Sequence, residues 1–215
     1  VRYDKSEFFD GFFSPRLSAG LTVNRNHNFR VSAQTGFRNP TTQDLFIGLD
    51  SGRNILVGSA PSNLERYSRT FEGNDGNSYI QTGAAAYNNS YTESSVDAYQ
   101  ISGNSADLVV SNPDVIKPEQ VTSIEVGYRG KFENLIIDFS AYHNTFEDFI
   151  SQEIVEAPLY GSVLDGTAEA AIDNSDFRQY STYTNSKAAV KSYGASIGLS
   201  TKVFSDFDLS GSYTY

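Results

Sequence analysis

The chain has 215 residues, a formal net charge of −10 and no Cys, Met or Trp. Without Cys it has no disulfide framework, thiolate metal site or cysteine nucleophile. The acidic balance argues against nucleic acid as a partner, because binding phosphates requires clustered Lys and Arg. No apolar run approaches the about 20 residues that a membrane helix requires, so we expect any membrane crossing to be made by strands.

Tyr and Phe make up 13% of the chain, and charged residues only 20%. Together with abundant Ser, Asn, Gly and Thr, this composition is typical of a β-rich surface or envelope protein rather than a helical cytosolic enzyme. The first residue is Val1, and the segment from Asp208 to Tyr215 stops inside an alternating pattern. We therefore expect this chain to be an internal part of a larger protein.

Alternating apolar and polar residues predict two strands near the start of the chain. In residues 13–23 Leu17, Ala19, Leu21 and Val23 alternate with polar or small residues, and in 29–38 the pattern repeats from Phe29. A short polar turn separates the two segments, which predicts a hairpin. Further alternating segments predict strands at 120–132, 134–154, 188–204 and 207–215.

Two long segments, residues 39–117 and 156–186, lack strong periodicity and are rich in Gly, Ser, Asn, Tyr and Asp. Connections in compact soluble domains are usually about 2–8 residues long. Short turns on one side and long loops on the other are typical of outer-membrane barrels. The sequence thus predicts an all-β, transmembrane antiparallel barrel wall with long extracellular loops. A soluble β-sandwich, whose strands also alternate, is the competing interpretation.

Several aromatic side chains lie near the expected strand ends, where a barrel carries its interfacial girdle. The same residue types are also good strand formers wherever they occur. They are Phe12, Phe13, Phe37, Tyr128, Phe132, Phe146, Phe149, Tyr193, Phe204 and Phe207.

Particular motifs resemble those of a known family. They are Phe13-Ser14-Pro15-Arg16-Leu17, Phe37-Arg38-Asn39-Pro40, the stretch from Asn112-Pro113 to Lys117-Pro118-Glu119, and Glu125-x-Gly127. In combination they resemble the late barrel strands of TonB-dependent outer-membrane transporters. Tyr193-Gly194-Ala195-Ser196 is similar to a strand that carries Gly-x-Glu in many members, with Ser196 in place of the Glu.

This resemblance implies a bacterial outer-membrane barrel of about 22 strands with a plugged lumen, of which the chain would supply about seven. It also implies a non-enzymatic importer that captures a scarce or bulky nutrient such as a metal chelate, a glycan or a peptide. The TonB–ExbB–ExbD complex would drive it through a plug domain outside these residues, outer-membrane lipid would surround it, and a surface lipoprotein lid is compatible with the long first loop. A surface adhesin or structural β-protein without transport is the alternative, and an outer-membrane enzyme would need an acid–base set that the sequence does not offer.

Charged residues on the polar side of the expected strands are candidates for bracing the plug. In a barrel lumen such side chains pair across strands or hold a plug by charge-assisted hydrogen bonds. These candidates are Arg30, Arg38, Glu125 and Arg129. Plain solvation of the wall is the simpler interpretation.

Tyrosines of the two long loops are the candidates for ligand capture. Tyr combines an apolar ring with a hydroxyl, which suits stacking on sugars, catecholates or peptide groups; tyrosines also serve simply to pack loops together. The candidates are Tyr67, Tyr79, Tyr87, Tyr91 and Tyr99 in the first loop and Tyr160, Tyr180 and Tyr183 in the second.

No pattern predicts a catalytic centre, a metal site or a cofactor. His27 and His143 lack the spacing of a nucleophile–base pair or a metal site. Two oxygen-rich stretches, residues 72–77 and 173–176, lack the full ligand series of a helix–loop–helix calcium site. We interpret both stretches as turns.

Overall fold

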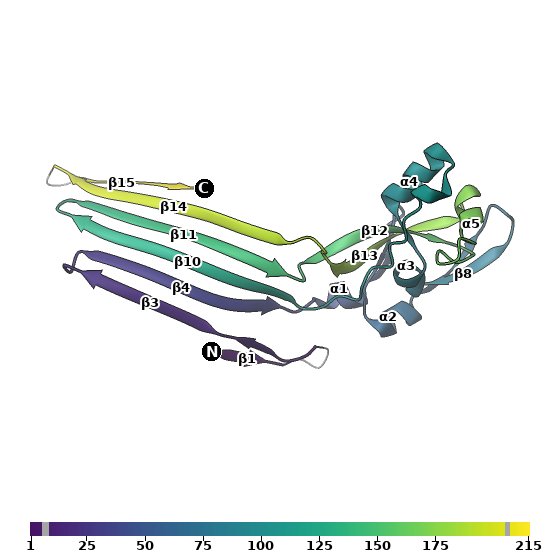
Figure 1. Cartoon of the computed structure of the whole chain (residues 1–215), viewed down its shortest axis with the longest axis horizontal. Helices are drawn as coiled ribbons and strands as arrows, with labels where there is room; N and C mark the ends of the chain where they lie inside the picture. Colours follow the sequence, from purple (N-terminus) through teal and green to yellow (C-terminus); the bar gives the residue numbers. More distant parts are fainter. Residues whose placement is uncertain (6–8, 205–206) are drawn as a thin grey trace. The chain divides into compact units, whose positions relative to one another are not determined.

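The computed structural model describes residues 1–5, 9–204 and 207–215, which divide into two compact units (Figure 1). The first, which we call the wall unit, consists of Val1–Arg38, Glu119–Phe149 and Lys187–Tyr215. The second, the loop unit, consists of Asn39–Pro118 and Ile150–Ser186. The segments that the sequence assigns to strands and to long loops therefore belong largely to different units.

The wall unit contains an antiparallel sheet in the order β15-β14-β11-β10-β4-β3. Its strands are β3 (Arg16–Val23), β4 (His27–Arg38), β10 (Glu119–Phe132), β11 (Leu135–Glu147), β14 (Val190–Val203) and β15 (Phe207–Thr214). The short strands β1 (Arg2–Asp4) and β2 (Phe12–Ser14) form a separate pair. Each neighbouring pair in the larger sheet is antiparallel, which is the mostly β, antiparallel architecture that alternation predicted.

Tight turns join β3 to β4 and β10 to β11. Asn24 and Arg25 have φ angles of 51° and 56°, and the Asn26 N–H donates to the Val23 carbonyl at 3.3 Å. Two consecutive residues with positive φ make the type I′ turn whose twist matches that of the flanking strands. Glu133, in the turn between β10 and β11, also has a positive φ of 49°.

Two of the predicted strands differ from those in the structure. The segment 13–23 is divided at Pro15, which lacks an N–H and separates β2 from β3. The segment 134–154 is divided between β11 and β12 (Ile150–Pro158), and Asp148 between them has a φ of 51°. Both interruptions are local backbone features that leave the alternation of apolar residues on either side intact.

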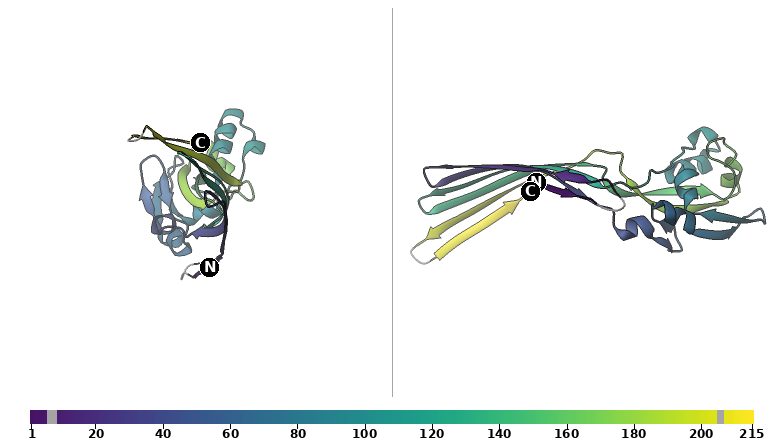
Figure 2. Two further views of the ribbon diagram at one scale, coloured as in Figure 1. Left: turned by 90° about the vertical axis from the view of Figure 1, so that its left-hand side faces the viewer. Right: turned by 90° about the horizontal axis from the view of Figure 1, so that it is seen from below.

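The register of the wall sheet separates apolar from polar side chains. Because directly opposed residues share a face, Leu17, Val31, Val126, Ile197 and Leu199 lie on one side of the sheet. These side chains are exposed, Leu17 by 77% and Leu21 by 63%, rather than packed against a second sheet. The strands form a single curved layer (Figure 2). A sandwich core is therefore the wrong interpretation for this sheet.

The loop unit has more regular structure than the weak periodicity of its sequence predicts. Its helices are α1 (Thr42–Phe46), α2 (Pro61–Arg66), α3 (Ala84–Asn88), α4 (Glu93–Ser102), the 3-10 turn η1 (Ser105–Asp107) and α5 (Glu169–Asp173). Its strands form a sheet of order β5-β6-β13-β12-β9 and a separate β7–β8 hairpin. They are β5 (Gly48–Asp50), β6 (Ile55–Val57), β7 (Ser68–Glu72), β8 (Ser78–Thr82), β9 (Tyr91–Thr92), β12 and β13 (Phe177–Asn185).

Two apolar clusters hold the loop unit together. The first joins Ile55, Val57, Leu64, Ala86, Tyr87, Val155, Ala157 and Tyr180, and the second joins Tyr91, Val96, Tyr99, Val163, Ala168 and Ile172. Each cluster combines residues from both long segments, so neither segment alone contains a complete core. Among the described residues, no helix is long and apolar enough to cross a membrane.

Candidate functional site

The polar face of the wall sheet brings together the charged residues that the sequence singled out. By register, Arg30 and Arg38 of β4 and Glu125 and Arg129 of β10 share this face. Serine and asparagine fill much of the rest: the Ser140 and Ser196 hydroxyls are 2.8 Å apart, and Asn144 Nδ2 donates to Ser192 Oγ at 3.1 Å. The face is therefore a hydrogen-bonding surface with a few isolated charges.

Asp138 of β11 lies between two of these arginines. Its carboxylate oxygens are 3.9 Å from Arg30 Nη2 and 3.9 Å from Arg129 Nη1. Sequence reasoning missed Asp138 because the residue lies on a different strand, and only the pairing of Arg129 with Asp138 places it there. Both contacts are long and about half-exposed, so they contribute little stability, about 0–1 kcal/mol each.

Glycine at position 127 allows this arrangement. Arg30 lies directly across Gly127, so that a Cβ at position 127 would overlap Arg30 Nε and would come within 2.8 Å of its Cγ. The side chain thereby spans β10 on its way to Asp138. The Gly of the Glu125-x-Gly127 motif thus has a physical reason, which is the close passage of a long side chain over the backbone.

Small side chains leave hollows on the polar face next to these charges. One hollow is lined by Arg16, Ser18, Gly20, Arg30, Ser32 and Glu125. Another is lined by residues that include Arg129, Asp138, Gly198, Ser200 and Ser212. Each hollow has at least one arginine and one carboxylate in its lining, so each could hold a polar group that approaches the polar face of the sheet.

Arg38 makes a closer ion pair than the other arginines. Its Nη2 donates to Glu119 Oε2 at 2.9 Å, and the Glu119 side chain is only 10% exposed. The two residues are directly opposed at the start of β10 and the end of β4. Arg38 therefore fixes the strand ends as well as contributing charge to the polar face.

Five of the eight candidate tyrosines are buried in the loop unit: Tyr87, Tyr91, Tyr99, Tyr180 and Tyr183 are each at most 5% exposed. Their hydroxyls serve the fold. Tyr87 donates to the Tyr183 carbonyl at 2.9 Å and accepts from the Tyr183 N–H at 2.9 Å, and Tyr180 donates to Gln81 Oε1 at 2.8 Å.

Tyr99 donates to Asp173 Oδ1 at 2.6 Å, and this hydrogen bond together with burial raises the pKa of Tyr99 above its ordinary value. These side chains pack the two long segments against each other.

The other three candidates, Tyr67, Tyr79 and Tyr160, are half-buried. Tyr79 and Tyr160 form a pair with ring centroids 5.0 Å apart and planes inclined by 34°. The Tyr79 hydroxyl donates to Asp75, and the Tyr160 hydroxyl donates to Asp176 Oδ2 at 3.2 Å. This pair, one ring from each long segment, offers aromatic surface beside hydrogen-bonding groups.

The two oxygen-rich stretches meet in the structure. The Asn74 N–H donates to Asp176 Oδ1 at 2.5 Å, and Asn74 Nδ2 donates to the Asn174 carbonyl at 2.7 Å. These two hydrogen bonds connect the tip of the β7–β8 hairpin to the segment after α5. In the parts of the chain that the structure describes, no group of three or more His, Cys, Asp or Glu is arranged to hold a metal ion.

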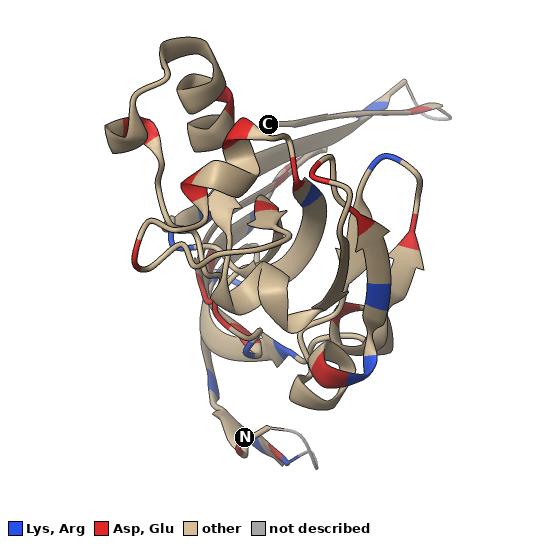
Figure 3. Cartoon of the chain, turned by 90° about the vertical axis from the view of Figure 1, so that its right-hand side faces the viewer, with Lys and Arg blue, Asp and Glu red and all other residues tan. Residues whose placement is uncertain are grey.

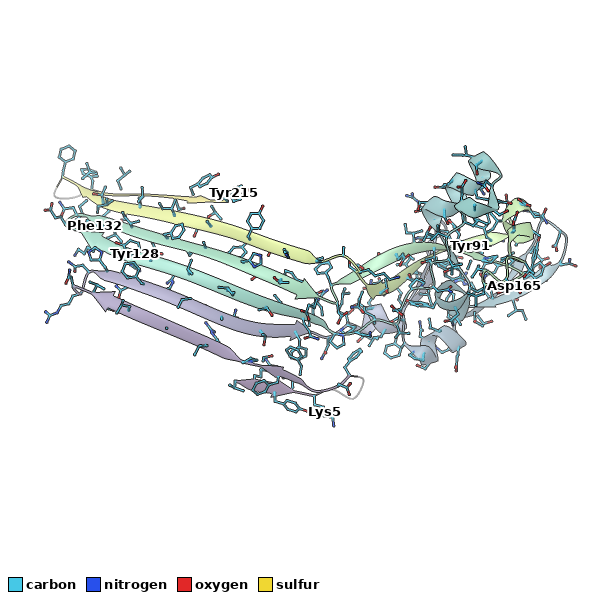
Figure 4. The ribbon with its side chains drawn as sticks, viewed as in Figure 1. Lys5, Tyr91, Tyr128, Phe132, Asp165 and Tyr215 are labelled. Atoms are coloured by element: carbon cyan, nitrogen blue, oxygen red, sulfur yellow. The ribbon has the colours of Figure 1, made fainter. Side chains whose placement is uncertain are left out.

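An aromatic cluster occupies the hairpin end of the apolar face. His27 Nδ1 lies 2.8 Å from the Tyr128 hydroxyl, and the His27 ring packs edge-on against Phe132 at 5.0 Å. Figure 4 shows Tyr128 and Phe132 near this end of the sheet. The position suits an interfacial girdle. By contrast, the register places Phe146, opposite Val121 and Val190, on the polar face, so it is not part of that girdle.

Charge is divided unequally between the two units. The loop unit contains 15 Asp and Glu against 5 Lys and Arg, a formal net charge of −10, whereas the wall unit contains 11 of each and is neutral. Figure 3 shows acidic positions spread over many elements of the loop unit. The acidity of the whole chain thus belongs to the segments that connect the wall strands.

The comparisons with known proteins agree with this architecture. The family model described as TonB dependent receptor-like, beta-barrel, matches residues 1–215. The crystal structure of the siderophore receptor PirA from Pseudomonas aeruginosa is similar in fold, with a TM-score of 0.52 and 15% sequence identity over 99% of this chain. This chain spans 29% of the length of PirA, and no curated protein matches it.

Members of that family are outer-membrane transporters rather than enzymes. The wall of such a barrel requires a one-layer sheet with an exposed apolar face and long connecting segments. The sheet of this chain has these features, and its other face is polar, with Ser, Gly and paired charges. The chain therefore belongs to the TonB-dependent receptor-like β-barrel family.

Proposed function

We propose that the chain forms part of the wall and the ligand-facing loops of an outer-membrane importer that takes up a scarce or bulky nutrient. The observation that carries the proposal is the separation of faces in the wall sheet. Lipid is the one surrounding that suits an uncovered apolar face of this size, since soluble proteins cover or avoid such patches. The wall would continue into a closed, plugged barrel of about 22 strands.

The charges of the polar face support a role in holding a plug. Arg30, Arg38, Glu125 and Arg129, with Asp138 between two of them, would face the lumen and offer charge-assisted hydrogen bonds to plug residues. The hollows beside Arg30 and Arg129 provide room for polar groups of the plug. Release of the plug would require the TonB–ExbB–ExbD complex, acting through residues outside this chain.

Ligand capture would fall to the loop unit, with Tyr79 and Tyr160 as the leading contacts and Tyr67 as a third. Tyr79 and Tyr160 are half-exposed, and so is the Tyr67 ring, although the Tyr67 hydroxyl is buried; the five buried tyrosines would act indirectly by fixing the fold. The loop unit's charge of −10 favours a neutral or cationic solute, because a field of one sign raises the local concentration of the opposite charge. A glycan, a cationic peptide or a cationic metal chelate fits; a strongly anionic chelate does not.

Uptake by the complete receptor tests the proposal. Bacteria that express the receptor, with or without TonB, would be given labelled ferric chelates, oligosaccharides and peptides as separate probes. We expect TonB-dependent uptake of a neutral or cationic probe and at least a tenfold loss in a receptor carrying both Tyr79→Ala and Tyr160→Ala. Tyr213→Ala, a change of an exposed ring on the apolar face of the wall sheet, is the control and should leave uptake unchanged.

Binding of a probe without TonB-dependent uptake would favour the adhesin interpretation instead. Uptake that survives the double substitution would locate ligand recognition elsewhere in the loops. A receptor that imports only strongly anionic chelates would contradict the charge argument.

A further inference from the structure

Glu156 of β12 is the least compensated carboxyl group of the loop unit. The residue is 5% exposed, and its Oε2 atom is buried without a hydrogen-bond partner. The other oxygen, Oε1, accepts one hydrogen bond from Gln179 Nε2 on the neighbouring strand β13, at 2.8 Å. A buried carboxylate normally has several donors or a cation around it, so this surrounding is poor for an ionised group.

The helix α4 brings two more carboxylates toward the same place. Glu93 and Asp97 are four residues apart and thus lie on one side of the helix. Gln179 Nε2 also donates to Glu93 Oε1 at 2.9 Å, so a single amide group bridges Glu93 and Glu156. Both carboxylates raise the pKa of Glu156, Glu93 from a half-buried position and Asp97 from an exposed one.

In the described part of the chain, no ion pair brings a positive side chain to this cluster. The ion pairs found among the described residues include none with Glu156, Glu93 or Asp97. Arg178, next to Gln179, lies instead over the Phe71 ring at 4.8 Å. On β9 the residue opposite Glu156 is Tyr91, which adds no positive charge. Two or three negative charges would therefore meet at the contact between α4 and the sheet.

We propose that Glu156 is a proton-binding site that attaches the first half of α4 to the sheet of the loop unit. With its proton bound, Glu156 is neutral and does not repel the carboxylates of α4. When the proton leaves, Glu156 repels Glu93 and Asp97, and this half of the helix is held less tightly on the sheet. The site is a property of the loop unit and does not depend on transport.

Burial, and then the neighbouring carboxylates, raise the pKa of Glu156 from 4.5 to about 7, so the proton leaves within the ordinary range of external pH. Because the pKa is raised in the folded state, the folded state binds the proton more tightly than the unfolded state. The contribution of the Glu156 proton to the stability of the folded state is therefore complete below about pH 4.5, and it is lost as the pH rises toward 7.

The second half of α4 is held independently. Tyr99 is buried in the second apolar cluster, and its hydroxyl donates to Asp173 of α5, while Val96, between Glu93 and Asp97, is buried in the same cluster and keeps the first half in contact with it. Loss of the proton should thus loosen the segment around Glu93 and Asp97 without unfolding the loop unit. A local change of this kind is visible in the exchange rates of individual backbone amides.

Hydrogen exchange of the complete receptor in detergent tests this proposal. Exchange of residues 93–97 would be measured from pH 5 to pH 8 and corrected for the intrinsic pH dependence of amide exchange. We expect protection in the wild type to fall at least tenfold across this range, and protection in Glu156→Gln to stay constant. Glu153→Gln, in the same strand but bound to the Ser111 hydroxyl at 2.6 Å, should behave like the wild type.

Two further measurements keep the proposal testable. Asp97→Asn leaves the buried group in place but removes one charge that raises the pKa of Glu156, so the midpoint of the change should move to lower pH and the loss of protection should be smaller. Addition of CaCl2 at pH 8 should have no effect on protection. Constant protection in the wild type, a pH dependence that persists in Glu156→Gln, or restoration of protection by Ca²⁺ in the wild type alone would each overturn the proposal.

Discussion

The polar face of the wall sheet depends on single residues whose roles are steric as well as electrostatic. Arg30 reaches Asp138 only because position 127, which it crosses, has no side chain. The ion pair itself is weak, since it is long and about half-exposed. The close passage is the stronger constraint, because an added methyl group would displace the arginine.

Replacement of Gly127 by Ala should destabilise the receptor by about 1 kcal/mol, the lower end of the cost of overpacking, because a flexible arginine can move aside. Gly198→Ala is the matched control on β14, where a Cβ would meet nothing closer than 3.9 Å. The measurement is the urea midpoint of the complete receptor in detergent. Equal midpoints for the two variants would show that Arg30 does not occupy the space above Gly127.

Among the elements, α4 shows how a short helix is bounded by its end residues. Thr92 accepts from the Ser95 N–H at the start, and Gly103 at the end has a φ of 66°. A left-handed residue at the C-terminus is most favourable as glycine, because a Cβ would crowd the next carbonyl. The boundaries of α4 are therefore set by local chemistry rather than by its core contacts.

Gly103→Ala should destabilise α4 by about 1–2 kcal/mol, the cost of placing an L-residue in the left-handed region. Nothing lies within 4 Å of the added Cβ, so the cost is purely one of backbone conformation. Gly211→Ala, at a strand position that is equally open but has no positive φ, should be neutral. Hydrogen exchange of residues 93–102 would distinguish the two, and equal protection in both variants would argue against a conformational cost at Gly103.

The wall strands could be predicted from sequence because each alternates for eight or more residues, and the period of two places Leu17, Val31 and Leu199 on one face without knowledge of their partners. The structure of the loop segments could not. Their apolar residues, such as Val57, Tyr87 and Tyr180, are far apart in the sequence and form a core only after the two segments combine.

The candidate sites show the same division. The face shared by Arg30, Arg38, Glu125 and Arg129 follows from the alternation alone, whereas their partner Asp138 depends on the register between β10 and β11. The sequence could not separate accessible tyrosines from buried ones, since Tyr79 and Tyr87 both lie in segments of mixed polarity. No sequence pattern marked Glu156 as unusual. Its surroundings are Gln179 on β13 and the carboxylates of α4, which are far from it in the sequence.

At the scale of the whole molecule, the unequal charge of the two units predicts how binding responds to salt. Attraction between the acidic loop unit and a cationic solute is screened as the Debye length falls from about 10 Å at 0.1 M salt to about 3 Å at 1 M. We expect the association rate of a cationic probe with the complete receptor to fall at least threefold between 0.05 and 0.5 M NaCl, and that of a neutral probe to stay constant. The rates would be measured by stopped-flow fluorescence, and a rate that rises with salt would contradict the argument.

The central position of β13 in the loop unit also affects the order in which the protein can assemble. β13 pairs in parallel with β6, joining Tyr180 to Ile55, and on its other side it pairs with β12. Within the first long segment β6 pairs with β5 on one edge only, and its other edge must wait for β13 of the second segment. Because such distant pairings close slowly, the loop unit should mature only after both segments have crossed. The newly inserted wall would then carry unfinished loops for a time, and this interval is when they are most vulnerable to surface proteases.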